Sequence, residues 1–419
     1  MLRGTLARSL WIAAFLVLSA GGVWADWPQF LGPHRNGVEE NGRLLAAEWW
    51  SNIPRVLWTV PVGPGFGGAA IYKSNVLILD RKAGEQDILR CLHVVDGNDL
   101  WQYAYDAPGD VQYPGSRSTP ATDGETVYSV GSRGHLKAVT LTDGELVWQG
   151  NVLADWGAAM PEWGVAQSPL LLEDSVVVAP WGIDAAVAAY GKASGEILWA
   201  TPNSTEGQMA YQSVVPMTLD GRLTLVASAA RGYTIGVDAA TGEQLWEFDS
   251  FECSTHIPSP TIVDGGRILL TGGYGAGTVM FRVFRQGNSY ATETLWANSN
   301  MGSQSGQALI HGDHIYGNSY STGGGIRCLS LDGEIVWDST KEGRRFDLGN
   351  LLIVGDVLFA INGRDGALFM LAASPRGYEG LGLVQVLSGN EVWGPLAYSD
   401  GHLIIRDQQN LVCLDVRAE

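Results

Sequence analysis

GVDAATGEQLWEFD, at residues 236–249, is the clearest copy of a unit that recurs along the 419-residue chain. Each copy holds a tight turn, commonly a Gly-Glu pair, an apolar residue and a tryptophan. Successive tryptophans stand 41 to 51 residues apart. A repeat of this length with one tryptophan per unit is typical of a β-propeller with four-stranded blades. The repeat tryptophans are Trp58, Trp101, Trp148, Trp199, Trp246, Trp296 and Trp337.

A second feature of the repeat, a tight polar turn between two apolar runs, can be counted independently. It occurs eight times, for example at Asp123-Gly124, Asp220-Gly221 and Asp400-Gly401. Asp, Asn and Gly tolerate the positive φ that two-residue hairpin turns need. The count predicts an all-β fold, an eight-bladed β-propeller of four-stranded antiparallel blades.

The two ends of the repeat array complement each other. Residues 391–417 supply three strands and lack the fourth, tryptophan-bearing one, whereas residues 54–62 (PRVLWTVPV) have the sequence of that missing strand. Pairing the two segments would close the ring and remove a free sheet edge. We therefore expect one propeller domain over residues 54–419, closed by pairing of its N- and C-terminal strands.

The residues before the propeller divide into two parts. Arg3 and Arg8 precede an apolar stretch, and a Val-Trp-Ala triplet ends at Ala25. This pattern indicates a secretory signal peptide over residues 1–25, followed by an N-terminal arm over residues 26–53. We expect an exported protein, periplasmic or extracellular, with no transmembrane span after cleavage. An uncleaved membrane anchor is the alternative, which the short apolar run disfavours.

The net charge argues against one class of partner, and the spacing of the cysteines argues against disulfide bonds. The formal net charge is −18, which argues against nucleic acid because phosphate contacts need a basic face. Cys91, Cys328 and Cys413 share one repeat position in separate blades, which places them beyond the roughly 7 Å Cα separation that a disulfide allows. We expect buried free thiols in a monomer.

The repeat "strand, turn, strand, L-x-A/C-L-D-x-x-T-G-E-x-L-W" resembles that of the pyrroloquinoline-quinone (PQQ) dehydrogenase propellers. The opening WPQFLGPHRNGV at residues 27–38 looks like the arm of secreted bacterial members. The resemblance implies that the seven repeat tryptophans pack between neighbouring blades. In its size and its lack of recognisable catalytic residues, the chain is more similar to BamB-like propellers, which scaffold outer-membrane assembly. The seventh unit departs from the pattern, because SPRGYEGLGLVQV carries no tryptophan.

Catalytic motifs of that family are not found in the sequence. Its dehydrogenases carry an adjacent Cys-Cys pair, hold Ca²⁺ with a Glu-Asn pair and use an Asp base, and no matching motif occurs here. His311 and His314 flank a hairpin turn, with no third ligand nearby for Zn²⁺. We therefore identify no catalytic residue, no metal ligand and no cofactor, while PQQ with Ca²⁺ stays open as an alternative.

Arginine and aromatic residues gather in the loops expected at one axial mouth of the ring, and both types are favoured at binding hot spots. From these loops the candidate binding residues are Arg117, Trp163, Arg231, Arg344, Arg345 and Trp393. The same two sets of loops also hold Phe66, Arg81, Tyr113, Glu162, Tyr211, His256, Tyr274, Gln304, Gln307 and Arg406. The alternative is a purely structural role, in which these side chains are hydrated at turns or stack within their own blades.

The sequence favours an exported, non-enzymatic PQQ-like propeller that binds a protein or an extended ligand on its axial loop face, as a BamB-like scaffold would. The alternative from another class is a PQQ-dependent quinoprotein oxidoreductase, or a degenerate relative that still binds PQQ. A third interpretation is carbohydrate binding, since tryptophan and tyrosine platforms suit sugar faces.

Overall fold

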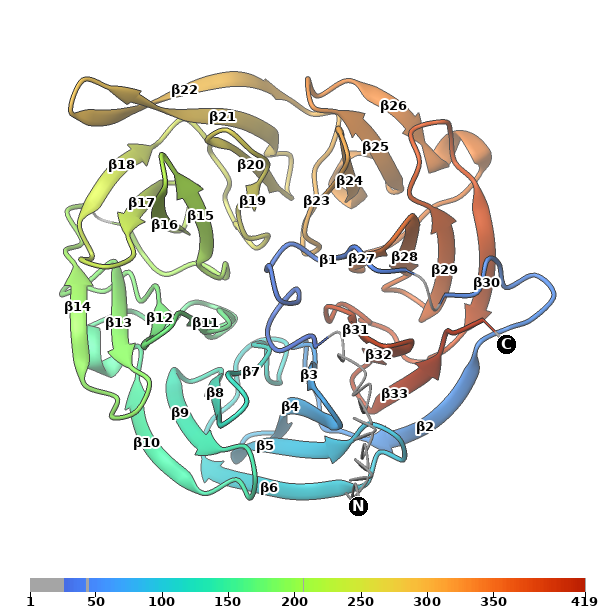
Figure 1. The fold of residues 1–419 in the computed structure, drawn as a ribbon, viewed down its shortest axis with the longest axis horizontal. Helices are drawn as coiled ribbons and strands as arrows, with labels where there is room; N and C mark the ends of the chain where they lie inside the picture. The colour runs from blue at the N-terminus through green and yellow to red at the C-terminus, as the bar shows by residue number, and fades with distance from the viewer. Residues whose placement is uncertain (1–25, 43–44, 206, 419) are drawn as a thin grey trace, which may run out of the picture.

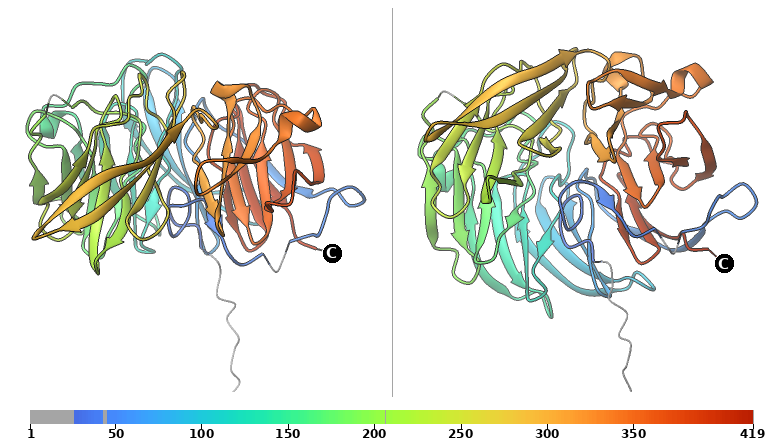
Figure 2. Two further views of the ribbon diagram at one scale, coloured as in Figure 1. Left: turned by 90° about the horizontal axis from the view of Figure 1, so that it is seen from above. Right: turned by 45° about the horizontal axis from the view of Figure 1, so that its top comes forward.

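Eight β-sheets stand around a central axis in the computed structural model, which describes residues 26–42, 45–205 and 207–418 (Figure 1). Seen from the side, the sheets form a disc whose inner strands run roughly along the axis and whose outer strands lie more obliquely (Figure 2). The prediction of an eight-bladed, all-β propeller is confirmed. The predicted signal peptide, residues 1–25, lies outside the described residues.

Each blade is an antiparallel sheet whose first strand lines the channel and whose fourth strand lies at the rim. Blades 1 to 4 are β3 (Ala70–Tyr72), β4 (Asn75–Lys82), β5 (Gln86–His93), β6 (Asp99–Asp106); β7 (Ala121–Thr122), β8 (Thr126–Val130), β9 (His135–Thr140), β10 (Leu146–Asn151); β11 (Leu170–Leu171), β12 (Ser175–Val178), β13 (Val187–Gly191), β14 (Ile197–Thr201); and β15 (Val215–Leu219), β16 (Arg222–Ser228), β17 (Thr234–Asp238), β18 (Gln244–Phe248). Blades 5 to 7 are β19 (Thr261–Ile262), β20 (Arg267–Gly272), β21 (Gly277–Gln286), β22 (Ser289–Asn298); β23 (Leu309–His311), β24 (His314–Asn318), β25 (Ile326–Ser330), β26 (Ile335–Asp338); and β27 (Leu351–Val354), β28 (Val357–Ile361), β29 (Ala367–Ala372), β30 (Gly380–Gln385). Short 3-10 helices follow β10, β24 and β26: η1 (Ala154–Trp156), η2 (Tyr320–Thr322) and η3 (Ser339–Glu342).

Blade 8 closes the ring as the sequence predicts. It consists of β31 (Ala397–Ser399), β32 (His402–Arg406) and β33 (Asn410–Asp415), and its fourth strand is β2 (Arg55–Pro61) from the other end of the chain. β2 runs antiparallel to β33, with Trp58 opposite Cys413. The sheet edges at the two ends of the array are thereby paired with each other.

Burial differs between inner and outer strands, and the sequence pattern follows it. The inner strands are covered on both faces by neighbouring blades, so β12 (SVVV) is buried at every position. At the rim only one face meets a neighbour, so in β10 the tryptophan Trp148 is buried while Leu146 and Val147 are exposed. The apolar runs and the single tryptophan therefore have separate causes.

Repeat tryptophans tie each blade to the next. Trp101 Nε1 donates a hydrogen bond of 2.8 Å to the Leu141 carbonyl of blade 2, and Trp148 Nε1 donates one of 2.6 Å to the Lys192 carbonyl of blade 3. The indole covers a turn glycine of that next blade, where a Cβ on Gly144 would stand 2.6 Å from Trp101. Matching bonds join Trp58 to Val94, Trp296 to Leu331 and Trp337 to Ser374.

The seam between blades 7 and 8 is built differently. Gly382 of β30 lies opposite Met370, the register position that a tryptophan occupies in the other blades. Trp49 of the N-terminal arm covers this glycine, since a Cβ there would stand 2.4 Å from the Trp49 Cβ. The Trp49 backbone N–H donates to the Leu381 carbonyl at 2.7 Å, and its ring stacks on Phe359 at 5.4 Å. The arm thus supplies the tryptophan that the seventh unit lacks.

The first part of the arm crosses the channel, as the blue segment in the centre of Figure 1 shows. Trp27 exchanges two backbone hydrogen bonds of 2.8 Å with Ile71 of blade 1. Across the ring, β1 (Val38–Glu39) pairs in parallel with β27 of blade 7. Between them, buried Arg35 donates to the backbone carbonyls of Ser168 and Pro169 in blade 3. The arm therefore bridges opposite sides of the ring and obstructs the channel.

All four cysteines are free and buried. Cys91, Cys328 and Cys413 each lie opposite the repeat tryptophan of their own blade. Burial raises the pKa of the Cys91 and Cys413 thiols to about 12. The prediction of buried free thiols is confirmed, and the shared position explains it.

Candidate functional site

Loops that join successive blades converge around one mouth of the channel, and their first buried polar groups form a hydrogen-bonded belt. Gly68 N–H donates to Thr119 Oγ1 at 3.1 Å, and the Thr119, Ser168 and Ser213 N–H groups each donate to the hydroxyl of the next blade at 2.9 Å, ending at Ser259. Because each bond crosses from one blade to the next, the belt fixes these loops relative to one another.

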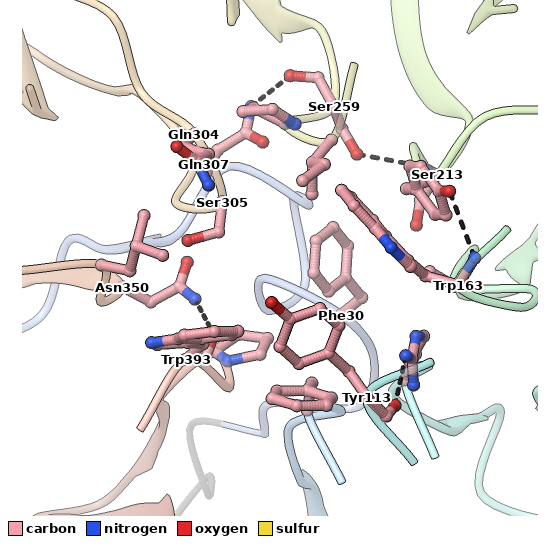
Figure 3. Close-up of a pocket in the computed structure, with 18 of the residues that line it drawn as sticks. Phe30, Tyr113, Trp163, Ser213, Ser259, Gln304, Ser305, Gln307, Asn350 and Trp393 are labelled. Atoms are coloured by element: carbon pink, nitrogen blue, oxygen red, sulfur yellow. Dashed lines mark hydrogen bonds between the residues drawn. The ribbon is translucent and has the colours of Figure 1, made fainter. Parts of the chain in front are cut away.

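Two residues before each of the five positions of this belt, and at the corresponding place in the other three loops, a side chain lines the channel. These eight side chains are joined by Tyr113, Trp163, Tyr274 and others in lining one pocket of about 190 Å³. Phe30 of the arm also lines it, so the crossing arm forms part of its floor (Figure 3). The eight side chains, one from each loop, are Phe66, Arg117, Ala166, Tyr211, Ile257, Ser305, Leu348 and Trp393.

One side of the pocket is a continuous aromatic arc. Phe66 stacks on Trp393 with ring centroids 5.3 Å apart, and Trp163 stacks on Tyr211 at 5.1 Å. Tyr113 joins the two stacks, lying edge-on to Trp163 at 6.2 Å and tilted against Trp393 at 6.0 Å. Such chains of rings present large apolar faces that are held rigidly.

The other side of the pocket is polar. Gln304, Ser305, Gln307 and Asn350 lie opposite the arc in Figure 3. Asn350 donates to the Trp393 carbonyl at 2.5 Å, and Gln307 donates to the Ser259 carbonyl at 2.8 Å, so both amides are fixed by the loops they join. The pocket is therefore amphipathic across its width.

Arg117 is the one cation among the described lining residues. Its guanidinium donates to the backbone carbonyls of Gln112, Tyr113 and Gly115 and lies over the Phe66 ring at 5.2 Å. No ion pair joins it to a carboxylate within the described chain. Burial lowers its pKa to about 10, so it is still protonated near neutral pH. The pocket thus carries a positive charge that is not paired directly with a carboxylate in the described structure; the nearby Glu162 is exposed.

Two further hydrogen-bonding groups of the pocket have no partner in the described structure. They are the Trp163 indole Nε1 and the Ser305 hydroxyl, both shielded from solvent. Buried groups without a partner cost free energy. These two atoms are therefore the points where a bound ligand would gain most from a hydrogen bond.

Three of the six candidate residues named from the sequence, Arg117, Trp163 and Trp393, line this pocket. The other three do not: Arg231, Arg344 and Arg345 are exposed, and Arg345 donates to the Gly323 carbonyl at 2.9 Å. The structure thus brings half of the candidates together.

Two other arginines of the mouth loops are buried. Arg81 bonds Asp87 at 2.7 Å and the Ala107 carbonyl at 3.0 Å, while Arg406 donates to the Gly63 carbonyl at 2.6 Å. Both side chains hold loops together and are not open to a partner.

Sequence reasoning missed lining residues that are neither charged nor aromatic, and one that comes from the arm. Ser259, Ser305, Leu348 and Asn350 are of the first kind, and Phe30 is the second. The signal of Ser305 and Leu348 in the sequence is positional, because each loop places a lining residue at this point, and Ser259 and Asn350 lie two positions further on in their loops. No such repeat could have indicated Phe30.

The lining does not fit PQQ with a bound Ca²⁺. PQQ carries three carboxylates, whereas the pocket offers one cation, Arg117, and no lining carboxylate; Glu162 is exposed beside it. Within the described residues, no group of three or more His, Cys, Asp or Glu side chains could hold a metal ion. Among the described lining residues there is no His, Asp, Glu, Lys or Cys that could act as a general acid or base.

Comparisons with known proteins agree with the fold. BamB from Moraxella catarrhalis is similar at 15% identity and a TM-score of 0.59, over 88% of this chain and 99% of that one. Quinohemoprotein alcohol dehydrogenase from Comamonas testosteroni is similar at 13% identity and a TM-score of 0.69, over 94% and 81%. At these identities the likeness concerns the fold alone.

Sequence comparison adds the family. No curated protein matches the chain, and none of the helices in its described part is long and apolar enough to cross a membrane. The family described as outer membrane protein assembly factor BamB matches residues 54–159 and 155–339, well over half of the chain. The chain therefore belongs to this family of PQQ-like propellers.

Proposed function

We propose that this protein is an exported, monomeric binding protein without catalytic activity, which holds a partner or an extended ligand at the pocketed mouth of its propeller. The observation that carries the proposal is the aromatic arc facing a polar wall, with Arg117 uncompensated beside it. A site of few polar groups among rigid apolar faces is the usual make-up of a binding pocket.

The family supports a scaffold in preference to an enzyme. The family is described as an outer membrane protein assembly factor, and BamB from Moraxella catarrhalis shares the fold. The quinoprotein alternative draws on an equally good fold match, yet the lining lacks the carboxylates and cations that PQQ and its metal need. Residues 1–25 support export by their sequence pattern.

The pocket is small for a whole ligand. Its volume of about 190 Å³ is below the roughly 300–1,000 Å³ typical of sites that bury drug-sized molecules. Tyr113 and Tyr274, with 41% and 53% of their surface exposed, extend the aromatic surface outward at the rim. We infer that the pocket takes one unit of a longer chain, the rest of which lies over the rim.

Site-specific photo-crosslinking in the producing cell tests the proposal. A benzophenone amino acid replaces Tyr113 at the mouth or, as the control, Asp220 in the exposed turn between the first two strands of blade 4, on the opposite face. We expect crosslinked species from position 113 that the additional changes Trp163→Ala and Trp393→Ala remove, and none of these species from position 220. Equal products from both faces, or dye-linked dehydrogenase turnover with added PQQ and Ca²⁺, would contradict the proposal.

A further inference from the structure

The pocket's unsatisfied groups define what would fill it. Trp163 Nε1 can only donate a hydrogen bond, the Ser305 hydroxyl can donate one, and Arg117 keeps donors beyond the three carbonyls that orient it. A ligand that satisfies them must carry several acceptor oxygens. Because Arg117 is cationic and makes no ion pair with a carboxylate in the described structure, one of these acceptors should be negatively charged.

The aromatic arc defines the shape of the ligand. The stacks of Phe66 on Trp393 and of Trp163 on Tyr211 leave flat faces with a cavity of one-ring size between them and the polar wall. A flat, largely C–H surface would bury there with a gain in apolar contact. A cationic ring is disfavoured by Arg117, and a compact phosphate would leave the aromatic faces uncovered.

The polar side of the pocket distinguishes two kinds of cyclic carboxylate, an aromatic acid and an acidic sugar. An aromatic carboxylate would place a hydrocarbon edge against Gln304, Ser305 and Asn350, and the Ser305 hydroxyl would stay without a hydrogen bond. A sugar ring has one C–H face and a rim of hydroxyl groups, so it satisfies the arc and the wall together.

We propose that the pocket binds one acidic pyranose unit, a uronic acid within or at the end of an acidic polysaccharide. The C–H face lies on the aromatic arc, the carboxylate pairs with Arg117, and the hydroxyl groups meet Ser305 and the amide wall. Neighbouring sugar units run outward over Tyr113 and Tyr274 at the rim. The inference rests on the mouth being the binding face, as proposed above, and adds the class of ligand.

Intrinsic tryptophan fluorescence and calorimetry with the purified protein test this inference. Three probes are compared: two trisaccharides of similar size, the acidic sodium trigalacturonate and the neutral maltotriose, and the smaller aromatic acid sodium benzoate. We expect trigalacturonate to bind and to change the tryptophan emission, with maltotriose binding at least tenfold more weakly and benzoate not measurably. Salt should weaken the binding of trigalacturonate, because dissolved ions screen the attraction between its carboxylate and Arg117.

Matched variants locate the site. Arg117→Gln should lower the affinity for trigalacturonate at least tenfold and leave that for maltotriose unchanged, whereas Trp393→Ala should lower both. Arg231→Gln, an exposed arginine outside the pocket, should change neither. A circular-dichroism spectrum and an unfolding curve equal to those of the wild type show that each variant is folded.

Three outcomes would overturn the inference: no binding of trigalacturonate, binding of benzoate as tight as that of trigalacturonate, or an unchanged trigalacturonate affinity in Arg117→Gln. If crosslinks from position 113 persist while trigalacturonate fails to bind, the ligand class is wrong and the binding face stands. If the crosslinks also fail, the proposed function itself is wrong.

Discussion

Tryptophans at the blade seams and tryptophans at the channel mouth differ in what they contact, although the seam residue Trp246 also has an indole Nε1 without a partner in the described structure. Trp148 at a seam is buried, and its Nε1 bonds the next blade. Trp163 and Trp393 at the mouth are only half-buried, stack on neighbouring rings, and Trp163 Nε1 has no partner in the described structure. Packing between blades thus explains the tryptophans that recur in the repeat. The mouth tryptophans lie outside the repeat position and do not have this packing role.

This difference indicates which residues of a repeat protein are candidates for function. Residues that recur in every unit satisfy the unit's own packing, whereas residues that break the repeat need another explanation. At the mouth that explanation is binding. At the seam of blades 7 and 8 it is architectural, because Trp49 of the arm replaces an absent repeat tryptophan.

Removing a seam tryptophan should have the largest effect. Trp148→Ala should lower the free energy of unfolding by about 3–5 kcal/mol, because it leaves a cavity between blades and removes a hydrogen bond to Lys192. Urea unfolding followed by circular dichroism measures the loss. Trp50→Ala, at a position 62% exposed, is the matched control and should stay within about 0.5 kcal/mol of the wild type. An unchanged midpoint for Trp148→Ala would refute its role.

The arm tryptophan should behave as a seam residue although it lies outside the repeat. Trp49→Ala should cost about 3 kcal/mol, at the lower end of the range for large-to-small core changes, since its Nε1 makes no hydrogen bond in the described structure. Limited proteolysis should then cut the arm faster than in the wild type. If stability and cleavage both match those of Trp50→Ala, the arm is not part of the closure.

A third prediction concerns pH and His256, which is 1% exposed beside the mouth. Burial lowers its folded-state pKa to about 3, whereas the unfolded value is near 6.5. Between these values only the unfolded chain binds the proton, so the free energy of unfolding should fall as pH drops from 6.5, by at most about 1.4 kcal/mol per unit. His256→Leu should lack this part of the slope in unfolding curves at pH 4.5–7.5, and His34→Gln, exposed on the arm, should keep it. Parallel slopes for His256→Leu and the wild type would disprove the assignment.

The last prediction concerns the reactivity of the cysteine thiols in the native protein, for which we expect no measurable alkylation. Burial raises the pKa of all four cysteines, that of Cys328 to about 11, and thiolate is the reactive form. Iodoacetamide at pH 8 should label none of them in the native protein and all four after denaturation, as mass spectrometry would show. Rapid native labelling of any seam cysteine would mean that its blade interface opens.

The sequence predicted the architecture well, because a propeller's constraints are local and repeat. The turn count led to eight blades, and the likeness of residues 54–62 to a missing fourth strand led to the closure through Trp58 and Cys413. The position of Trp49 could not be predicted in this way, because the arm has no repeat register and Gly382 alone does not indicate what covers it.

The mouth was predicted only in part. Residue type pointed to Arg117, Trp163 and Trp393, yet the same criterion also selected Arg231, which does not line the pocket, and Arg81, which is buried against Asp87. Whether a loop arginine faces the channel, the solvent or the next strand depends on side-chain direction in three dimensions. Composition of a loop does not contain that information.

The double variant Trp163→Ala, Trp393→Ala tests the separation of seam and mouth most directly, when its photo-crosslinks from position 113 and its unfolding free energy are measured together. The account predicts that the crosslinks disappear while the unfolding free energy falls clearly less than in Trp148→Ala, because both side chains are partly exposed. Persistent crosslinks, or a loss of stability as large as that of Trp148→Ala, would contradict it.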